Sequence, residues 1–366
     1  MKALIIGGAG ATGRAIINGL LQRGFAVTAL GRGKHALEQA DCISFIQADP
    51  HEKGQMEAAL ADQQFDLAIV TYGRLRHAAE VLAGKTTRLI SVGGAAPIYK
   101  GWGEMTSMNP WETTEPTPLF LAEDHPLARA ETPDRFAALV RKTEEAMLQM
   151  HREGVFNVTH FRYPLVYGPN NICPAEWSLV RRFRDGRRPL ILPGGGLTLV
   201  SRGYAENVAH GILLAVDKPD ASAGQVYNIC DNQLLYNHEW VSRVSQILGH
   251  SFETVDIPFR WLPSGFRATS TQLLYRHHGV MSIEKIKQQL GYRDLVSAEE
   301  AIERTVRWYH DHPLEAGHEA ERNLGDPFDY AYEDAVIAAY RKASAEFVAE
   351  EKGMERKPVV WKHPYQ

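Results

Sequence analysis

Three glycines close to the start of the chain have the spacing of a phosphate-binding turn. Gly7, Gly10 and Gly13 follow the apolar run 2–6 and precede a segment of helical periodicity that ends near Gly24. Glycines allow a tight turn, and the N-terminus of the following helix offers unpaired N–H groups to a pyrophosphate. The pattern therefore predicts a dinucleotide site. The alternative is a turn that packs the helix onto the strand and binds nothing.

Two basic residues, Arg32 and Lys34, follow a second apolar run at 25–30. Enzymes that prefer NAD normally carry an acidic residue at the end of this strand, where it accepts a hydrogen bond from the ribose 2′-hydroxyl. Gly31 takes that place here, and the planar guanidinium of Arg32 suits the oxygens of a 2′-phosphate. The sequence therefore favours NADP, with NAD as the second choice. The alternative is that Arg32 is a solvated loop charge.

Alternating strands and helices must position these residues. Apolar runs predict strands at residues 2–6, 25–30, 43–48, 66–70, 88–92 and 157–163, and a helix at 53–60. The alternation predicts an α/β fold of the Rossmann type, with a doubly wound parallel sheet covered on both faces. Ligands of such sheets bind beyond the carboxyl ends of the strands. Thr71 and Ser91, at two of those ends, are therefore expected close to the chemistry.

Several stretches make the chain resemble the extended and atypical short-chain dehydrogenase/reductases, the NAD-dependent epimerase/dehydratase family. They are the glycine turn and the stretches 162–169, 203–209, 224–229 and 282–292. The resemblance covers roughly residues 1–310 and is specific for fold and cofactor rather than for reaction.

The resemblance implies roles for individual residues. Asp49 would meet the adenine amino group, and Ser91 would hydrogen-bond a hydroxyl or carbonyl of the substrate. Without the resemblance, a serine in that place is a simple strand cap. The cofactor site would be formed by Gly7, Gly10, Ala11, Thr12, Gly13, Arg32, Asp49, Thr71, Lys142, Pro164 and Val166.

The tyrosine that transfers the proton in this family has no counterpart here. In the family a lysine one helical turn after it lowers the pKa of the phenol and holds the nicotinamide ribose. The matching segment is 134–145, where Ala138 stands four residues before Lys142 and no tyrosine occurs. Three explanations are open. Another tyrosine takes over the proton transfer, Lys142 or a group of the substrate transfers the proton, or the protein binds the cofactor without catalysing a reaction. The replacement tyrosines to consider are Tyr72, Tyr99 and Tyr163, and our catalytic candidates are Lys142, Ser91 and Tyr163.

The substrate side is expected to involve a long irregular stretch, 95–133, that is rich in proline and tryptophan. A loop of this length predicts a lid over the substrate, with Trp102 as a stacking surface. The alternative is that it packs on the domain surface or forms a subunit contact. Tyr99 and Arg202 are further candidates for substrate binding, because related nucleotide-sugar enzymes place a basic residue near the position of Arg202.

Five arginines fall within the window 181–188. They predict a local anion site for an anionic small-molecule substrate, whereas the alternative is a solvated helix face. A third possibility is RNA, which some plastid relatives of the family bind. The formal net charge of -4 makes nucleic acid an unfavoured partner.

Composition sets the remaining limits. The chain has 366 residues, of which 44% are hydrophobic, and its three scattered cysteines exclude a disulfide framework and a cysteine-rich zinc site. No metal site is expected. No segment approaches the ~20 apolar residues of a membrane span, so we expect a cytoplasmic protein.

We expect two unequal parts that are interleaved in sequence. Residues 1–170 form an NAD(P)-binding Rossmann domain, completed by about 204–235, and residues 171–330 form a smaller substrate-binding region. Residues 331–366 form a C-terminal helix, from about 332 to 350, and a tail, and the helix docks on the same chain or on a partner subunit. A homodimer is usual in the family.

The predicted function is that of an NAD(P)-dependent oxidoreductase or epimerase/dehydratase. It would act on a hydroxyl or carbonyl of a small molecule, without the usual catalytic tyrosine. The alternative is a non-catalytic NADP-binding sensor or RNA-associated protein of the same fold.

Overall fold

The core of the protein is a parallel sheet. The computed structural model describes residues 1–34, 37, 39–94, 98–101, 118–128, 135–262, 277–357 and 361–363. Within them, one seven-stranded sheet has the order β10-β6-β5-β4-β1-β2-β3, and every neighbouring pair is parallel. Its strands are β1 (Lys2–Ile6), β2 (Ala26–Gly31), β3 (Ser44–Gln47), β4 (Leu67–Val70), β5 (Arg88–Gly93), β6 (Asn157–Arg162) and β10 (Gln225–Asn228). The predicted doubly wound α/β fold is confirmed.

Helices cover both faces of this sheet, which is why its central strands are apolar on both sides. One face carries α1 (Ala11–Gln22), α6 (Ala205–Asp217) and α8 (Glu284–Leu290). The other face carries α2 (Lys53–Ala59), α3 (Leu75–Leu82) and α4 (Arg135–Arg152).

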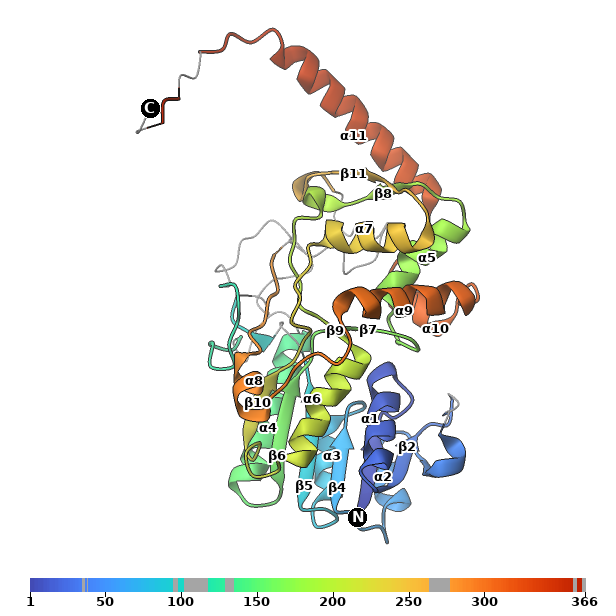
Figure 1. Ribbon diagram of the computed structural model, residues 1–366, viewed down its shortest axis with the longest axis vertical. Coiled ribbons are helices and arrows are strands. Elements are labelled where there is room, and N and C mark those ends of the chain that lie inside the picture. The colour runs from blue at the N-terminus through green and yellow to red at the C-terminus, as the bar shows by residue number, and fades with distance from the viewer. Residues whose placement is uncertain are drawn as a thin grey trace.

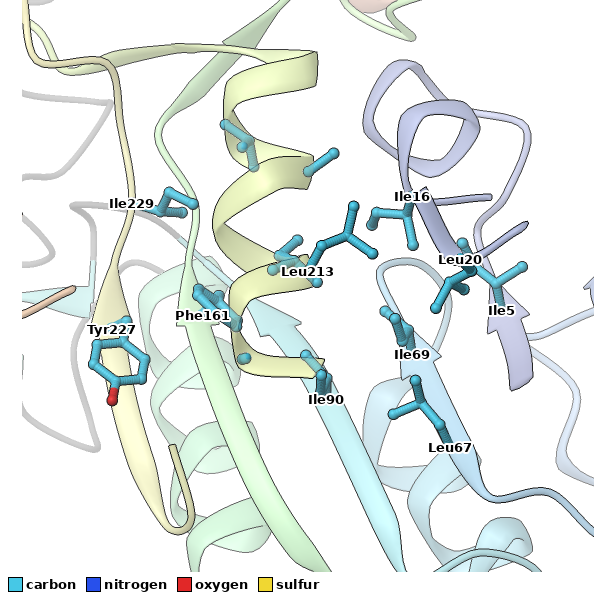
Figure 2. Close-up of a cluster of buried hydrophobic side chains, with 14 of the residues drawn as sticks. Ile5, Ile16, Leu20, Leu67, Ile69, Ile90, Phe161, Leu213, Tyr227 and Ile229 are labelled. Carbon is cyan, nitrogen blue, oxygen red and sulfur yellow. The ribbon is translucent and has the colours of Figure 1, made fainter. Parts of the chain in front are cut away.

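The contact between α1 and α6 shows how closely the helices on one face of the sheet pack. Figure 2 shows Ile16 and Leu20 of α1 on the same side of the sheet as Leu213 of α6. Burying each such side chain stabilises the fold by about 1.5–3 kcal/mol. Gly19 has no room for a side chain, because a Cβ atom there would lie 2.1 Å from Leu213 Cδ1.

A second group of elements lies beyond the carboxyl ends of the strands (Figure 1). It contains two small parallel pairs, β7 (Leu165–Tyr167) with β9 (Arg202–Tyr204), and β8 (Pro189–Ile191) with β11 (Glu253–Val255). Its helices are α5 (Ala175–Arg184), α7 (Asn237–Leu248), α9 (Ala298–Asp311) and α10 (Glu319–Asn323). Trp177, Trp240 and Tyr309 contribute to its own apolar core.

Four of the five arginines at 181–188 contact carboxylates of the chain itself. Arg182, on α5, is fully buried between Asp326, at 2.5 Å, and Glu333. Arg187 contacts Glu333 at 3.1 Å and Asp334 at 2.7 Å. The other three arginines contact Glu321, the carbonyl of His310 and Glu253. A guanidinium is kept in the interior only when counter-charges compensate it. Arg182 and Arg187 are therefore held by carboxylates of the chain, whereas Arg184 and Arg188 are exposed. The anion site at 181–188 stays a prediction.

Four of these acidic partners, Glu321, Asp326, Glu333 and Asp334, lie close to or within the first turns of α11 (Tyr330–Glu351). The Asp329 carboxylate caps this helix by accepting from the Tyr332 amide. Glu333 and Ile337 are buried against the body of the protein, whereas the later turns run away from it (Figure 1). The helix thus docks on its own chain through its first turns. Neither α11 nor any other described helix has the length and apolarity that a membrane span requires.

Candidate functional site

In the glycine turn between β1 and α1, contacts within the protein determine two of the glycines of the motif Gly7, Gly10 and Gly13. Gly7 has a φ of +102°, and a Cβ atom on it would lie 2.3 Å from Thr71 Oγ1. A Cβ atom on Gly13 would lie 2.1 Å from the Gly7 carbonyl oxygen. Packing alone therefore requires glycine at positions 7 and 13.

Gly10 differs from the other two glycines. It is the N-cap of α1, its backbone is extended (φ -74°, ψ 167°), and no side chain caps the helix. A Cβ atom on it would meet nothing closer than the Gly7 carbonyl oxygen, at 3.9 Å. The protein leaves this space open beside the N–H groups of the first helical turn, where Ala11 and Thr12 lie. An anion such as a pyrophosphate fits such a cradle.

Three predicted cofactor residues lie at the carboxyl ends of neighbouring strands. Arg32 follows β2, and its Nη2 donates to the hydroxyl of Tyr72, which follows β4, at 3.2 Å. Asp49 follows β3, and its Oδ1 accepts from the amide of His51 at 2.9 Å. Thr71 donates from Oγ1 to the Ile6 carbonyl at 3.3 Å, next to the glycine turn. The sheet thus brings these groups to one edge.

Pro164 and Val166 lie where the chain passes from β6 into β7. Val166 pairs with Gly203 of β9, and a Cβ atom on Gly203 would lie 2.6 Å from Pro164 Cγ. This close approach fixes the segment at the boundary between the large sheet and the small one. The cofactor roles assigned to both residues stay predictions.

Ser91 is enclosed beneath α4. Its side chain is fully buried, and its Oγ lies 2.8 Å from Nδ1 of His160. The other ring nitrogen of His160 lies 3.7 Å from Glu144 Oε2, and burial lowers the pKa of His160 to about 4. A Cβ atom on Gly93 would lie 2.4 Å from that same nitrogen, so the imidazole takes the space next to the strand. Ser91 therefore hydrogen-bonds within the protein interior.

A buried polar chain continues from Glu144. Arg162 donates to both Glu144 oxygens, at 2.7 and 2.8 Å, and to the Tyr99 hydroxyl at 2.7 Å. Tyr99 in turn donates to Asn228 Oδ1 at 2.6 Å, and burial raises the pKa of Tyr99 to about 12. Tyr99, predicted to bind substrate, thus lies inside this network.

The same network ties distant segments to the sheet. Asn228 Nδ2 donates to the carbonyls of Leu121, at 2.8 Å, and Ser282, at 3.1 Å. Sequence reasoning missed Glu144, His160 and Asn228. The signal for the network was the position of Arg162, Asn228 and Ser282 within family-like stretches.

The structure separates the catalytic candidates. Lys142 is exposed, on the side of α4 away from the buried residues Val140 and Glu144. Tyr163 follows β6, and burial raises the pKa of its phenol while the nearby hydroxyl of Thr12 partly offsets that effect. Of the three candidates, Tyr163 is therefore the one placed beside the glycine turn. The catalytic role of each stays a prediction.

Arg202 is buried in the second group of elements. Its guanidinium donates to Asn237 Oδ1 at 2.7 Å and lies 4.6 Å from the centre of the Trp240 ring. Burial raises the pKa of the neighbouring Glu176 to about 7, although Arg202 acts in the opposite direction. The substrate role of Arg202 stays a prediction, and Trp102 lies outside the described residues. No group of three or more metal-ligating side chains occurs among the residues that the structure describes.

Comparison with known proteins places this geometry in a family. The chain is 24% identical to UDP-N-acetyl-alpha-D-glucosaminuronate decarboxylase of Bacillus cytotoxicus, over 85% of this chain and 98% of that protein. It is 26% identical to the decarboxylating sterol-4-alpha-carboxylate 3-dehydrogenase of Bos taurus, over 46% of this chain and 53% of that protein. The crystal structure of dTDP-glucose 4,6-dehydratase from Bacillus anthracis, in complex with NAD, has a TM-score of 0.65. That likeness spans 85% of this chain and 97% of the dehydratase at 17% identity.

A sequence model of the family itself matches two segments, residues 3–87 and 116–230. These segments contain the glycine turn, Arg32, Asp49 and Thr71 as well as the stretch that follows β6. A nucleotide cofactor, NAD or NADP, and a small-molecule substrate are typical of such proteins. The chain belongs to the NAD dependent epimerase/dehydratase family.

Proposed function

We propose that this chain is an NADP-dependent enzyme that oxidises, reduces or epimerises a hydroxyl or carbonyl group of a small molecule. The observation that carries the proposal is the open space at Gly10, beside the uncapped N-terminus of α1. Packing explains the glycines at 7 and 13 but not the one at 10. A bound pyrophosphate supplies the missing reason.

The preference for NADP rests on Arg32. Its guanidinium lies at the carboxyl end of β2, where the adenosine ribose binds in Rossmann folds. A 2′-phosphate offers it two acceptor oxygens, whereas NAD offers only a hydroxyl. Thr71, Pro164 and Val166 would line the rest of the dinucleotide path, and Asp49 would face the adenine. When bound, the nicotinamide would accept a hydride in an oxidation and donate one in a reduction.

Tyr163 is our candidate for the missing proton donor. Burial raises the pKa of its phenol, so the group keeps its proton at neutral pH and can donate it to a developing alkoxide. Tyr99 is occupied by Arg162 and Asn228, and Tyr72 lies at the adenosine end beside Arg32. A reaction in which Lys142 or a substrate group handles the proton is the competing mechanism.

The substrate is proposed only by class. The family includes proteins named for sugar nucleotides and for sterols, so the shared chemistry is an oxidisable carbon–oxygen bond. An anionic substrate would need cationic groups other than Arg182 and Arg187, because carboxylates of the chain already pair with these two. We keep a cytoplasmic homodimer as the expected form.

The first experiment asks which nucleotide the purified protein carries, by mass spectrometry after mild denaturation. NADPH or NADP is the expected result, and a protein that neither carries nor binds a dinucleotide would end the proposal. The second experiment follows NADPH fluorescence across a panel of aldehydes, ketones and nucleotide sugars. Fluorescence loss with one member identifies the reacting class.

A non-catalytic cofactor sensor is the second candidate function. Two observations favour it: α4 carries no tyrosine, and Ser91 is enclosed with His160 rather than open to a ligand. Tight NADPH binding with no turnover on any member of the panel would support the sensor. An RNA-associated role is less favoured, because Arg182 and Arg187 of the arginine window pair with carboxylates of the chain.

A further inference from the structure

We propose that Tyr72 is a positioning residue that sets the preference for NADP by holding Arg32 in place. The inference rests on the proposed function and deepens it, since it names a second residue for the 2′-phosphate. Tyr72 comes from the end of β4, whereas Arg32 comes from the end of β2. The two are therefore brought together only by the fold.

The backbone of Tyr72 is pinned on both sides. The Thr71 amide donates to the Ile6 carbonyl at 2.9 Å, which holds the segment against the end of β1. A Cβ atom on Gly7 would lie 2.8 Å from Tyr72 Cβ, so the glycine turn and Tyr72 are in close contact. On the other side, Gly73 has a φ of +92°, and a Cβ atom there would lie 2.7 Å from Pro50. Tyr72 thus has little freedom to move along the sheet edge.

The side chain of Tyr72 reaches across that edge to Arg32. Its hydroxyl accepts from Arg32 Nη2 at 3.2 Å, and the guanidinium carbon lies 5.9 Å from the centre of the ring. The ring of His51 packs edge-on at 5.1 Å and restrains the phenol from the β3 side. Tyr72 is 39% exposed, so this assembly faces the solvent where a ligand would arrive.

The contact leaves the rest of the guanidinium for a ligand. Within the part of the chain that the structure describes, Tyr72 is the hydrogen-bond partner of Arg32, through Nη2 alone. Nε and Nη1 are left to donate to two oxygens of a phosphate. A guanidinium that is already oriented loses less conformational freedom when the phosphate binds. The phenol therefore favours the 2′-phosphorylated cofactor without touching it.

The phenol could instead serve as a wall against which the adenine stacks. The two roles differ in what they recognise. A wall would strengthen binding of every adenine nucleotide, whereas a positioning residue acts only on those that carry a 2′-phosphate. Adenosine 2′,5′-bisphosphate and adenosine 5′-monophosphate differ in that group alone, so they separate the two roles.

The test is a calorimetric titration of both nucleotides, and of NADPH and NADH, into the full-length protein. Tyr72→Phe keeps the ring and removes the hydroxyl, and Arg32→Ala removes the guanidinium. Tyr332→Phe is the matched control, because that tyrosine is also 39% exposed but lies on α11. Melting temperatures of all variants report whether folding is intact.

We expect Tyr72→Phe to lower the preference for the 2′-phosphorylated nucleotide by about three- to tenfold, the effect of one positioning hydrogen bond. Binding of adenosine 5′-monophosphate stays unchanged. In the Arg32→Ala background the same substitution has no further effect.

Other outcomes overturn the inference. An unchanged preference in Tyr72→Phe, an equal loss for both nucleotides, or an effect that persists without Arg32 would each reject the positioning role. If wild type binds neither NADPH nor NADH, the proposed function fails as well. If wild type prefers NADPH but Tyr72→Phe has no effect, only this inference fails.

Discussion

Replacing Gly10 with alanine should separate cofactor binding from folding. A Cβ atom at this position lies 3.9 Å from the nearest protein atom, and the backbone is extended, so alanine fits. We expect the free energy of unfolding to change by no more than about 1 kcal/mol, the scale of an N-cap substitution. The added methyl group lies in the space assigned to the pyrophosphate and keeps the ligand away from the amides of α1.

The cost to binding follows from the hydrogen bonds that are lost. A bond to a charged acceptor contributes about 1.5–3 kcal/mol, so losing one weakens binding about 10- to 100-fold. Fluorescence titration with NADPH measures this loss, and thermal unfolding measures the stability.

Two other glycines provide controls. Gly13→Ala places a Cβ atom 2.1 Å from the Gly7 carbonyl oxygen and should destabilise the protein by about 1–3 kcal/mol. Gly54 lies on α2, and a Cβ atom there would have no neighbouring atom within 4 Å, so Gly54→Ala should leave binding intact. A folded Gly10→Ala variant that binds NADPH as tightly as wild type would refute the assignment of the turn.

Three further predictions concern the interior and the proton donor. Glu333→Ala removes one of the two carboxylates that contact buried Arg182, so it should lower the free energy of unfolding in urea by about 3–5 kcal/mol. Asp334→Ala is the control: the Asp334 side chain is 61% exposed, so its loss should cost less than about 1 kcal/mol. Similar losses in both variants would contradict the argument. Burial lowers the pKa of His160 to about 4, so as the pH falls the unfolded chain binds a proton before the folded protein does. The free energy of unfolding of wild type should therefore fall by about 3 kcal/mol between pH 6.5 and pH 4, relative to that of His160→Asn. Urea unfolding across that pH range measures the difference. A constant difference between the two proteins would show that the imidazole is not held neutral. Tyr163→Phe should lower turnover at least tenfold while changing the affinity for NADPH by no more than about threefold. Full turnover in this variant would mean that Lys142 or a substrate group is the proton donor instead.

Six of the seven strands of the sheet could be predicted from short, mainly apolar runs, whereas β10 was indicated only by the family resemblance. The prediction for β1 coincides with the observed strand, and those for β3 and β6 end one residue late, at residues 48 and 163. Arg32 and Thr71 were correctly placed at strand ends, because parallel strands bring their carboxyl ends to one edge. Local pattern is sufficient for this level of description.

The buried face of α4 could also be predicted from the sequence. Ala137, Val140, Glu144 and Met147 are buried at helical spacing, which puts Lys142 on the opposite side. The apolar members of this series would have indicated the same face.

Long-range partners could not be predicted. Tyr99 meets Asn228 across 129 positions, and Arg182 meets Glu333 across 151. A polar side chain within a motif reveals neither its partner nor its burial, and a run of arginines has the same composition whether it faces solvent or carboxylates. The enclosure of Ser91 depends in the same way on His160, which follows it by 69 positions.

The pairing of α5 with the start of α11 also affects how the protein matures on the ribosome. Arg182 is synthesised 151 residues before Glu333. At about 5–20 residues per second, the chain waits roughly 8–30 s for that carboxylate. During this interval the second group of elements cannot bury its arginine with both counter-charges in place. Complete folding of this region therefore follows synthesis of the C-terminal segment, and a chain interrupted before it would keep its arginines open to chaperones and proteases.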